Sequence, residues 1–150
     1  MRLTAFTDYG LRALMRMASE PDRAFSTAEL ADFFAVSRHH LTKIMATLAT
    51  QGIVVTRRGA GGGAMLARPA PEIRLGDVVR ILEQGQALVE CFAPEGGNCT
   101  IRGCCRLRVR LRAAEEAFLA ALNRSTLADC ALPPDSVPAL SEASGRGWPD

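Results

Sequence analysis

The strongest constraint on the fold is a pair of helical patterns joined by a very short break. Ser26 and Glu29 form an S-x-x-E capping box at the start of a short helix. A tight break follows at residues 35–36, and Ser37 is placed to cap a second helix that runs to Gly52. Two helices joined by so short a turn are typical of a helix-turn-helix unit.

A β-branched run and a glycine run follow this unit directly. Residues 53–57 read IVVTR, residues 58–63 read RGAGGG, and residues 64–68 read AMLAR. This pattern predicts a β-hairpin with a glycine tip and arginines at its base. The glycine run lacks the G-K-[ST] ending of a P-loop, and a strand follows it, so we reject nucleotide binding there. A hairpin in this position is the wing of a winged helix.

The charge of the chain is small in sum but uneven in distribution. The formal net charge is +2, yet no acidic residue occurs between Phe33 and Pro71, where five lysines and arginines lie. A block of one sign within a folded pattern is expected of a protein that binds a phosphate backbone, and a solvated basic face is the alternative. The predicted DNA-contacting residues are Ser37, Arg38, His39, His40, Thr42 and Lys43 on the recognition helix and Arg57, Arg58, Gly59, Gly61 and Gly62 in the wing.

Helical patterns also flank this unit. A first helix is expected to be capped by Thr7 and to end near Ser19, with Asp8 in its first turn, where the helix dipole favours a carboxylate. A short amphipathic helix is expected over residues 75–83, and a long helix ends near Asn123. The long helix carries an apolar seam with spacings of four and three: Leu107, Leu111, Ala114, Phe118 and Ala121.

The seam predicts a homodimer. One chain with one wing reads a single half-site, and a dimer matches a palindromic operator, whereas the alternative is that the seam packs on the winged helix. The expected fold is therefore mainly α with a small β-hairpin wing. We expect a winged helix-turn-helix DNA-binding domain at residues 1–72, a metal-binding loop and dimerisation helix at 73–130, and a disordered tail at 131–150.

Composition excludes several classes of protein. No run of about 18 apolar residues exists and no signal peptide is visible, so we expect a cytoplasmic chain that does not enter a membrane. No histidine lies outside the recognition helix and no carboxylate pair has general acid–base spacing, which argues against an enzyme. No C-x-x-C pair exists, which argues against a dithiol redox protein.

Four of the five cysteines lie in one segment, CFAPEGGNCTIRGCC, at residues 91–105. Its loop glycines let the backbone fold back on itself, so several thiolates can converge. Cys91, Cys99 and Cys105 have the spacing C-x7-C-x5-C, which we interpret as a metal or iron–sulfur site. An odd cysteine count argues against a disulfide framework, and a glycine-rich loop argues against simple burial.

Two other cysteines leave the type of site open. Cys104 stands next to Cys105, so a site with four thiolates (Cys91, Cys99, Cys104 and Cys105) could hold zinc instead. We rank zinc lower because adjacent cysteines rarely both reach one tetrahedral centre without strain. Cys130 is expected to pack as a small apolar residue.

Four segments in order together resemble one family. They are LTAFTDYGLRALMRMA at residues 3–18, SRHHLTKI at 37–44, RGAGGG at 58–63, and the CFAPEGGNC…CCRL loop. The sequence resembles the bacterial iron–sulfur winged-helix regulators, a family with a nitric-oxide-sensing branch (NsrR), an iron–sulfur-biogenesis branch (IscR) and an iron-responsive branch (RirA). The resemblance runs from Met1 to about Cys130 and implies a homodimer with a cluster near the base of a long dimerisation helix.

The resemblance also implies a ligand set. Cys91, Cys99 and Cys105 match the three cluster cysteines, since the C-R-L that follows the family's third cysteine begins here at Cys105. The biogenesis branch has a histidine soon afterwards, where this chain has Arg108. The nitric-oxide-sensing branch takes an aspartate of the TDYGLRAL segment from the partner subunit, and Asp8 matches it.

The implied protein is therefore an iron–sulfur-dependent repressor related to the NsrR branch. Its cofactor would be a [4Fe-4S] cluster in preference to [2Fe-2S], held by three cysteines and Asp8. Its partners would be double-stranded operator DNA, a second copy of the chain, and nitric oxide as the signal. An iron-responsive repressor of the same family and a zinc-stabilised DNA-binding protein remain as alternatives.

Overall fold

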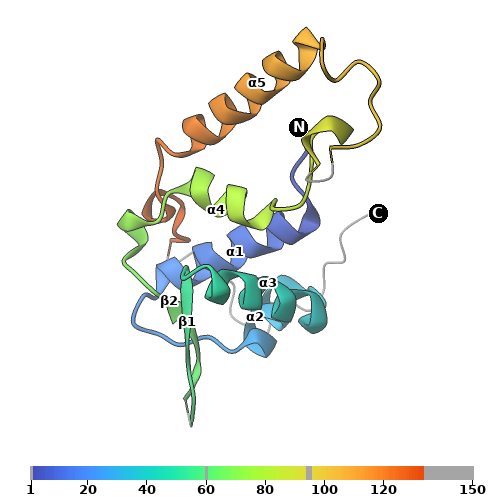
Figure 1. Ribbon diagram of the computed structural model, residues 1–150. Coiled ribbons are helices and arrows are strands. Elements are labelled where there is room, and N and C mark those ends of the chain that lie inside the picture. The colour runs from blue at the N-terminus through green and yellow to red at the C-terminus, as the bar shows by residue number, and fades with distance from the viewer. Residues whose placement is uncertain (1, 60, 94–95, 134–150) are drawn as a thin grey trace.

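The structure is a computed structural model that describes residues 2–59, 61–93 and 96–133 (Figure 1). Its helices and strands are α1 (Ala5–Ser19), α2 (Thr27–Phe34), α3 (Arg38–Thr50), β1 (Val54–Arg57), β2 (Gly63–Leu66), α4 (Leu75–Leu82) and α5 (Arg106–Leu122), with 3₁₀ turns η1 (Ala70–Glu72), η2 (Glu90–Phe92) and η3 (Leu127–Cys130). The mainly helical winged helix-turn-helix with a two-stranded hairpin is thus confirmed. The expected disordered tail lies outside the described residues from position 134 onward.

The first helix begins one turn earlier than predicted. Thr4 is the N-cap of α1, and its hydroxyl oxygen accepts the backbone N–H of Thr7 at 3.2 Å. The prediction that Thr7 caps the helix is wrong, because the side chain of Thr7 is fully buried inside the first turn. Glu83 fixes this start further, since its Oε1 accepts the N–H of Thr4 at 2.8 Å and the Thr4 hydroxyl at 3.0 Å. Because Thr4 and Glu83 are far apart in the sequence, no local sequence pattern predicts their contact.

The helix-turn-helix depends on one residue in a left-handed conformation. Ser26 caps α2 by accepting the N–H of Glu29 at 3.0 Å, as predicted, but the Glu29 carboxylate pairs with Arg23, so no reciprocal bond of a capping box is described. The chain then reverses at Ala35, which has φ 52° and ψ 42°. The backbone N–H of Val36 donates to the carbonyl oxygen of Ala31, in α2, at 2.9 Å. This left-handed C-cap ends α2 and directs the chain into α3.

The hairpin forms the wing and is anchored to the body at its base. β1 and β2 are antiparallel, with Val54 opposite Leu66 and Arg57 opposite Gly63. At the tip, the N–H of Gly62 donates to the carbonyl oxygen of Gly59 at 2.9 Å, which closes a tight turn. The wing projects away from the helices at the bottom of Figure 1.

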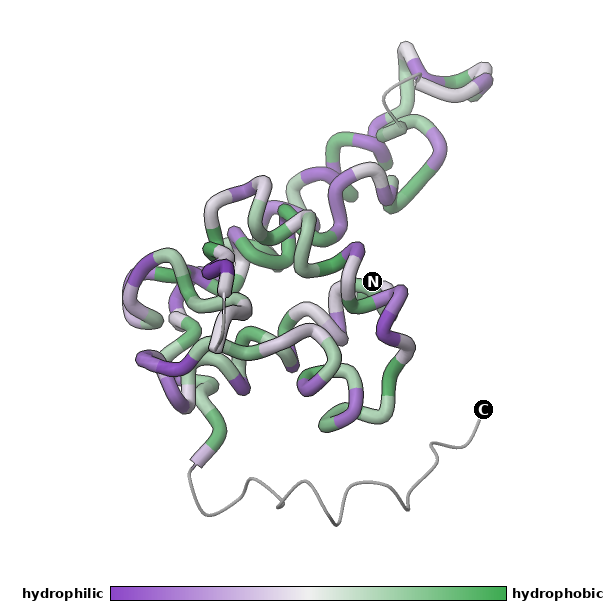
Figure 2. The backbone as a smooth tube through the Cα atoms, turned by 90° about the horizontal axis from the view of Figure 1, so that it is seen from below, coloured by the Kyte–Doolittle hydropathy of each residue, from purple (hydrophilic) through white to green (hydrophobic). Residues whose placement is uncertain are grey.

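Helices α1, α2, α3 and α4 and the base of the hairpin share one apolar core. Figure 2 shows hydrophobic and hydrophilic segments alternating along these helices, as expected of elements with one buried face. Because η3 contributes to the core, the chain returns to the body after α5. The largest fully buried side chains are Phe25, Leu14, Met17, Leu30, Leu41, Ile44, Leu48, Ile53, Ile73, Leu127, Val54 and Val78.

Polar contacts help to attach the last helix to α4. Asn123, at the end of α5, accepts the N–H of Asp77 at 3.0 Å and donates to its carboxylate at 2.9 Å, which caps the start of α4. Arg80 makes two parallel hydrogen bonds to Glu116, at 3.1 and 2.9 Å. In Figure 1, α5 rises beyond α4, on the side of the molecule away from the wing.

The predicted seam of α5 is not what docks this helix. In the described structure Leu119 is the buried residue of α5, and it lies outside the seam. Leu107 of the seam is 63% exposed, while Leu111 and Phe118 are half-buried. The seam is therefore partly covered within one chain, and its exposed residues are Leu107 and Ala114. No helix in the described part of the chain is long and apolar enough to cross a membrane.

Candidate nucleic-acid interface and metal centre

The outer face of α3 presents short polar and basic side chains. Leu41, Ile44 and Leu48 are fully buried, which turns the opposite face of the helix outward. Arg38, His39, Thr42 and Lys43 are exposed on that face, together with Ser37 at the N-cap. The residues that helix periodicity assigned to a DNA-contacting surface are therefore solvent-accessible, except His40.

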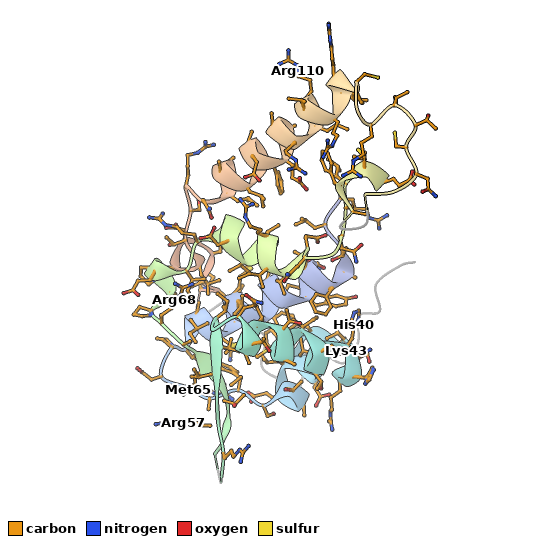
Figure 3. The ribbon with its side chains drawn as sticks, viewed as in Figure 1. His40, Lys43, Arg57, Met65, Arg68 and Arg110 are labelled. Atoms are coloured by element: carbon orange, nitrogen blue, oxygen red, sulfur yellow. The ribbon has the colours of Figure 1, made fainter. Side chains whose placement is uncertain are left out.

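His40 lies against α1. Its ring centroid is 6.0 Å from that of Phe6 and 5.8 Å from that of Tyr9, the second contact being edge-to-face. Figure 3 shows His40 near Lys43, at the N-terminal end of α3. Because these rings partly bury the imidazole, His40 links the start of the recognition helix to the first turns of α1.

The wing carries its cations on an exposed strand and turn. Arg57, Arg58, Gly59 and Gly61 are exposed, and Gly62 is half-buried. A Cβ at Gly62 would lie 2.5 Å from the carbonyl oxygen of Arg57, so a side chain there would break the turn. A glycine tip of this kind lets a second backbone approach closely.

The cations of the basic block form no salt bridge within the described residues. Within the described residues, the salt bridges involve Asp8, Glu20, Glu29 and Glu116, and none reaches a cation of the block. Unpaired cations can bind phosphates without first giving up an ion pair. These cations are Arg38, Lys43, Arg57, Arg58 and Arg68.

The cysteine segment lies between η2 and α5. Cys91 is in η2 and Cys105 is the N-cap of α5, and both side chains are half-buried, as is Cys99 between them. Cys104 is exposed, and its Sγ is 3.5 Å from the carbonyl oxygen of Ile101. All four are free cysteines in the described structure.

Two side chains hold the loop of this segment closed. Glu90 accepts the backbone N–H of Asn98 at 2.9 Å, and Arg102 donates to the carbonyl oxygen of Gly96 at 3.2 Å. Gly96 and Gly97 both have positive φ, of 77° and 57°. The chain therefore folds back between Cys91 and Cys99 through a conformation that favours glycine.

The thiol donors suit a soft metal or an iron–sulfur cluster, but the described loop does not gather them into a centre. Within residues 2–59, 61–93 and 96–133, no three cysteine, histidine or carboxylate side chains lie close enough together to hold a metal ion. The fourth predicted ligand, Asp8, lies on α1 and pairs with Arg12, whose Nη2 is 2.7 Å from Oδ2. Within one chain, the four predicted ligands therefore do not come together.

The sequence interpretation missed several residues that shape these regions. Arg12, the partner of Asp8, could have been found, because an acid and a base four residues apart face each other on a helix. Arg16 is 7% exposed and lies over the rings of Phe25 and Phe33, at 5.0 and 5.4 Å from their centroids. No local sequence pattern predicts the aromatic rings that cover Arg16.

Comparisons with known proteins agree with this geometry. The family model of Rrf2, described as an iron-dependent transcriptional regulator, matches residues 3–132. The structure of IscR from T. potens is similar at a TM-score of 0.66 and 25% identity, over 86% of this chain and 85% of that one. CymR, the global cysteine regulator of B. subtilis, gives a TM-score of 0.63 and 27% identity, over 87% and 96%. The oxidized form of S. aureus CymR gives 0.66 and 26%, over 91% and 100%.

Proposed function

The chain belongs to the Rrf2 family of transcriptional regulators, and from this premise we propose that it is an iron–sulfur-dependent repressor that releases its operator in response to nitric oxide. As a member of this family it is a DNA-binding regulator and not an enzyme. The observation that supports the finer proposal is that three half-buried free cysteines lie in one short segment of the chain, from η2 to the N-cap of α5.

The proposed DNA contacts divide between helix and wing. On α3, Ser37, Arg38, His39, His40, Thr42 and Lys43 would face the major groove. In the wing, Arg57, Arg58, Gly59, Gly61 and Gly62 would follow the phosphate backbone. Nine of these eleven residues are exposed, and the cations among them lack ion pairs in the described structure, which supports these contacts.

We further propose a homodimer formed through α5. The face of α5 that docks on α4 carries Leu119 and Glu116, whereas Leu107 and Ala114 of the seam are exposed. A helix with one face used inside the chain and an apolar face outside it suits a symmetric partner. Two copies would then place two recognition helices on two half-sites.

The proposed cluster ligands are Cys91, Cys99 and Cys105, completed by Asp8 of the partner subunit. Thiolates favour iron–sulfur clusters, and a [4Fe-4S] cluster with one oxygen ligand supplies an iron that a small diatomic molecule can reach. The chain's own contribution is the loop that Glu90 and Arg102 hold closed around these cysteines. For Asp8 to serve as a ligand, it must first leave Arg12.

The position of Asp8 suggests how the two functions communicate. It lies in the first turn of α1, between Phe6 and Tyr9, and these two rings contact His40 at the start of α3. A change in what Asp8 binds would therefore act on the same helical turn that positions the recognition helix. Since half-site spacing is fixed by the DNA, a small shift of α3 weakens operator binding.

An iron-responsive repressor is the second candidate function. The observation in its favour is the description of the matched family as iron-dependent. The same cysteines would bind the cluster, but depletion of iron, and not nitric oxide, would release the operator. Binding measured after iron chelation and after nitric oxide treatment separates the two signals.

Asp8→Ala tests the proposal, with Asp22→Ala as a matched carboxylate control. Asp22 is exposed and lies in the turn after α1. We expect Asp8→Ala, purified without oxygen, to lose cluster faster than the wild type and to bind operator with a weaker response to nitric oxide. Asp22→Ala should behave as the wild type. Unchanged cluster retention and an unchanged response in Asp8→Ala would refute the role of this ligand.

A further inference from the structure

The centre of the exposed face of α3 holds three residues that each present a methyl group. Thr42, Ala46 and Thr50 are spaced by four residues, so they share one face of the helix, and all three are exposed. Arg38 and Lys43 lie on the same outward side and are unpaired in the described structure. The cations would hold the phosphates on either side, which leaves the three central residues facing the floor of the groove.

The hydroxyl hydrogens of both threonines are already used by the helix. Thr42 Oγ1 donates to the carbonyl oxygen of Arg38 at 2.8 Å, and Thr50 Oγ1 donates to that of Ala46 at 2.9 Å. A threonine bonded in this way cannot also donate to a base, and its χ1 is held in one rotamer. The hydroxyl oxygen can still accept a hydrogen bond, but the γ-methyl group is fixed in direction and makes no hydrogen bond, so it is available for apolar contact.

We propose that α3 recognises thymine in the operator through apolar contact between these methyl groups and the C5-methyl group of the base. In the major groove thymine is the one unmodified base with a methyl group, and threonine methyl and alanine side chains are suited to it. Thr42, in the N-terminal half of the helix, makes the principal contact, because that half reaches the base edges. Ala46 and Thr50 extend the contact along the groove.

This inference rests on the proposed operator binding, and its test begins with a duplex that the protein itself enriches from a random pool. The probe is that duplex, compared with the same duplex in which deoxyuridine replaces thymidine at each half-site position in turn. The exchange removes only the C5-methyl group and keeps every hydrogen bond. We expect the affinity of the wild-type chain to fall about fourfold for each methyl group lost from the contact.

Paired variants assign the contact to the threonine methyl group. Thr42→Ser keeps the hydroxyl and removes the methyl, so its affinity for the thymidine duplex should fall about fourfold, and its sensitivity to deoxyuridine at that position should disappear. Thr42→Val keeps the methyl and should bind nearly as the wild type does. Thr47→Ser is the matched control, since Thr47 makes the same backbone bond, at 3.2 Å to Lys43, but lines a cavity with Phe6 and Ile81.

The outcomes separate this inference from the proposed function. An enriched duplex whose affinity is unchanged by deoxyuridine would overturn thymine recognition and leave operator binding intact. A loss of binding in Thr42→Val, with normal binding in Thr42→Ser, would assign recognition to the oxygen and also overturn it. A chain that enriches no duplex at all would overturn both proposals.

Discussion

The body and the arm of this molecule are stabilised in different ways. The body consists of α1 to α4 with the hairpin, and its core side chains, such as Leu14 and Leu41, are fully buried. The arm consists of residues 90–122, with the cysteine segment and α5, and Leu119 is the buried residue of its helix. Extensive apolar packing holds the body, whereas the arm is docked at its C-terminal end by Leu119, by hydrogen bonds of Asn123 and by the ion pair between Arg80 and Glu116.

The difference indicates where binding energy can change the structure. A segment with little buried apolar surface opens at low free-energy cost, so a bound partner or ligand can determine its conformation. A densely packed segment moves as a unit. We therefore expect dimerisation and ligand binding to order the arm, and we expect the body to transmit the effect to DNA as one rigid element.

Truncation of matched leucines in the two regions gives the largest expected contrast. Leu14→Ala removes a fully buried side chain of the body and should lower the free energy of unfolding by about 3 kcal/mol. Leu107→Ala removes a side chain that is 63% exposed and should change the unfolding of the dilute monomer by less than about 0.5 kcal/mol.

Urea unfolding at low protein concentration measures the two changes, and sedimentation at increasing concentration measures dimerisation. We expect Leu107→Ala to weaken dimerisation. Equal losses of monomer stability in the two variants would show that the arm is packed as firmly as the body.

The next largest effect is expected from a substitution where α4 and α5 cross closely. A Cβ at Gly76 would lie 2.2 Å from the backbone carbonyl oxygen of Leu119, which cannot move without displacing α5. Gly76→Ala should therefore cost about 2 kcal/mol and loosen the arm, which hydrogen exchange of α5 amides would detect. At Gly103 nothing lies within 4 Å of the added atom, so Gly103→Ala should leave exchange of α5 unchanged. Similar exchange in both variants would contradict this docking.

Arginines of the two regions should differ in their effect on DNA binding. Arg57 lies on the wing and Arg110 near the far end of the arm, on opposite sides of the molecule in Figure 3. Arg57→Ala should weaken binding about tenfold on every sequence and reduce the salt slope by about one unit, as loss of a phosphate contact does. Arg110→Ala should leave both quantities unchanged. Retained affinity with an altered base preference in Arg57→Ala would contradict a phosphate contact.

The ion pair between the body and the arm gives the smallest effect, visible in its pH dependence. Glu116 accepts a hydrogen bond from Arg80, and this bond is the largest cause that holds the pKa of Glu116 below its usual value. The attraction between the two charges lowers the pKa further. The pair therefore stabilises the docked arm fully above the ordinary carboxyl pKa, and this contribution disappears as pH falls through the lowered one. Because both side chains are exposed, the contribution is small and falls with salt.

Glu116→Gln measures this contribution against Glu72→Gln, an exposed carboxylate outside any salt bridge of the described residues. Unfolding of Glu116→Gln should differ from that of the wild type at neutral pH, and the two should converge in acid. A difference that is constant with pH would show that the ion pair contributes nothing.

Local sequence patterns predicted the elements of the body well, because helix periodicity and caps are local properties. Ser26 and the β-branched and glycine runs after Gly52 placed α2 and the wing correctly. The error at Thr7 arose because Thr4 is an equally good cap, and the choice between them depends on Glu83, far along the chain. The two rings against His40 likewise come from another helix, so the sequence placed this residue only on an exposed basic face.

The candidate site was predictable in composition but not in geometry. The spacing of Cys91, Cys99 and Cys105 is visible in the sequence, as are the glycines that fold the loop back. Whether the thiols converge depends on contacts beyond the segment, including what the thiols bind, and local propensity does not specify these contacts. Asp8 shows the same limit, since its partner in the chain is Arg12 while its proposed role lies with the other subunit.

We propose that a cluster held by the arm controls the binding of the body to DNA. The most direct test of this proposal records the visible absorbance of protein purified without oxygen and the fluorescence anisotropy of a labelled operator in the same nitric oxide titration. We expect a brown protein whose colour and DNA binding are lost together, over the same range of nitric oxide concentration. A colourless protein that contains zinc or no metal, or DNA binding that persists after the colour is gone, would contradict it.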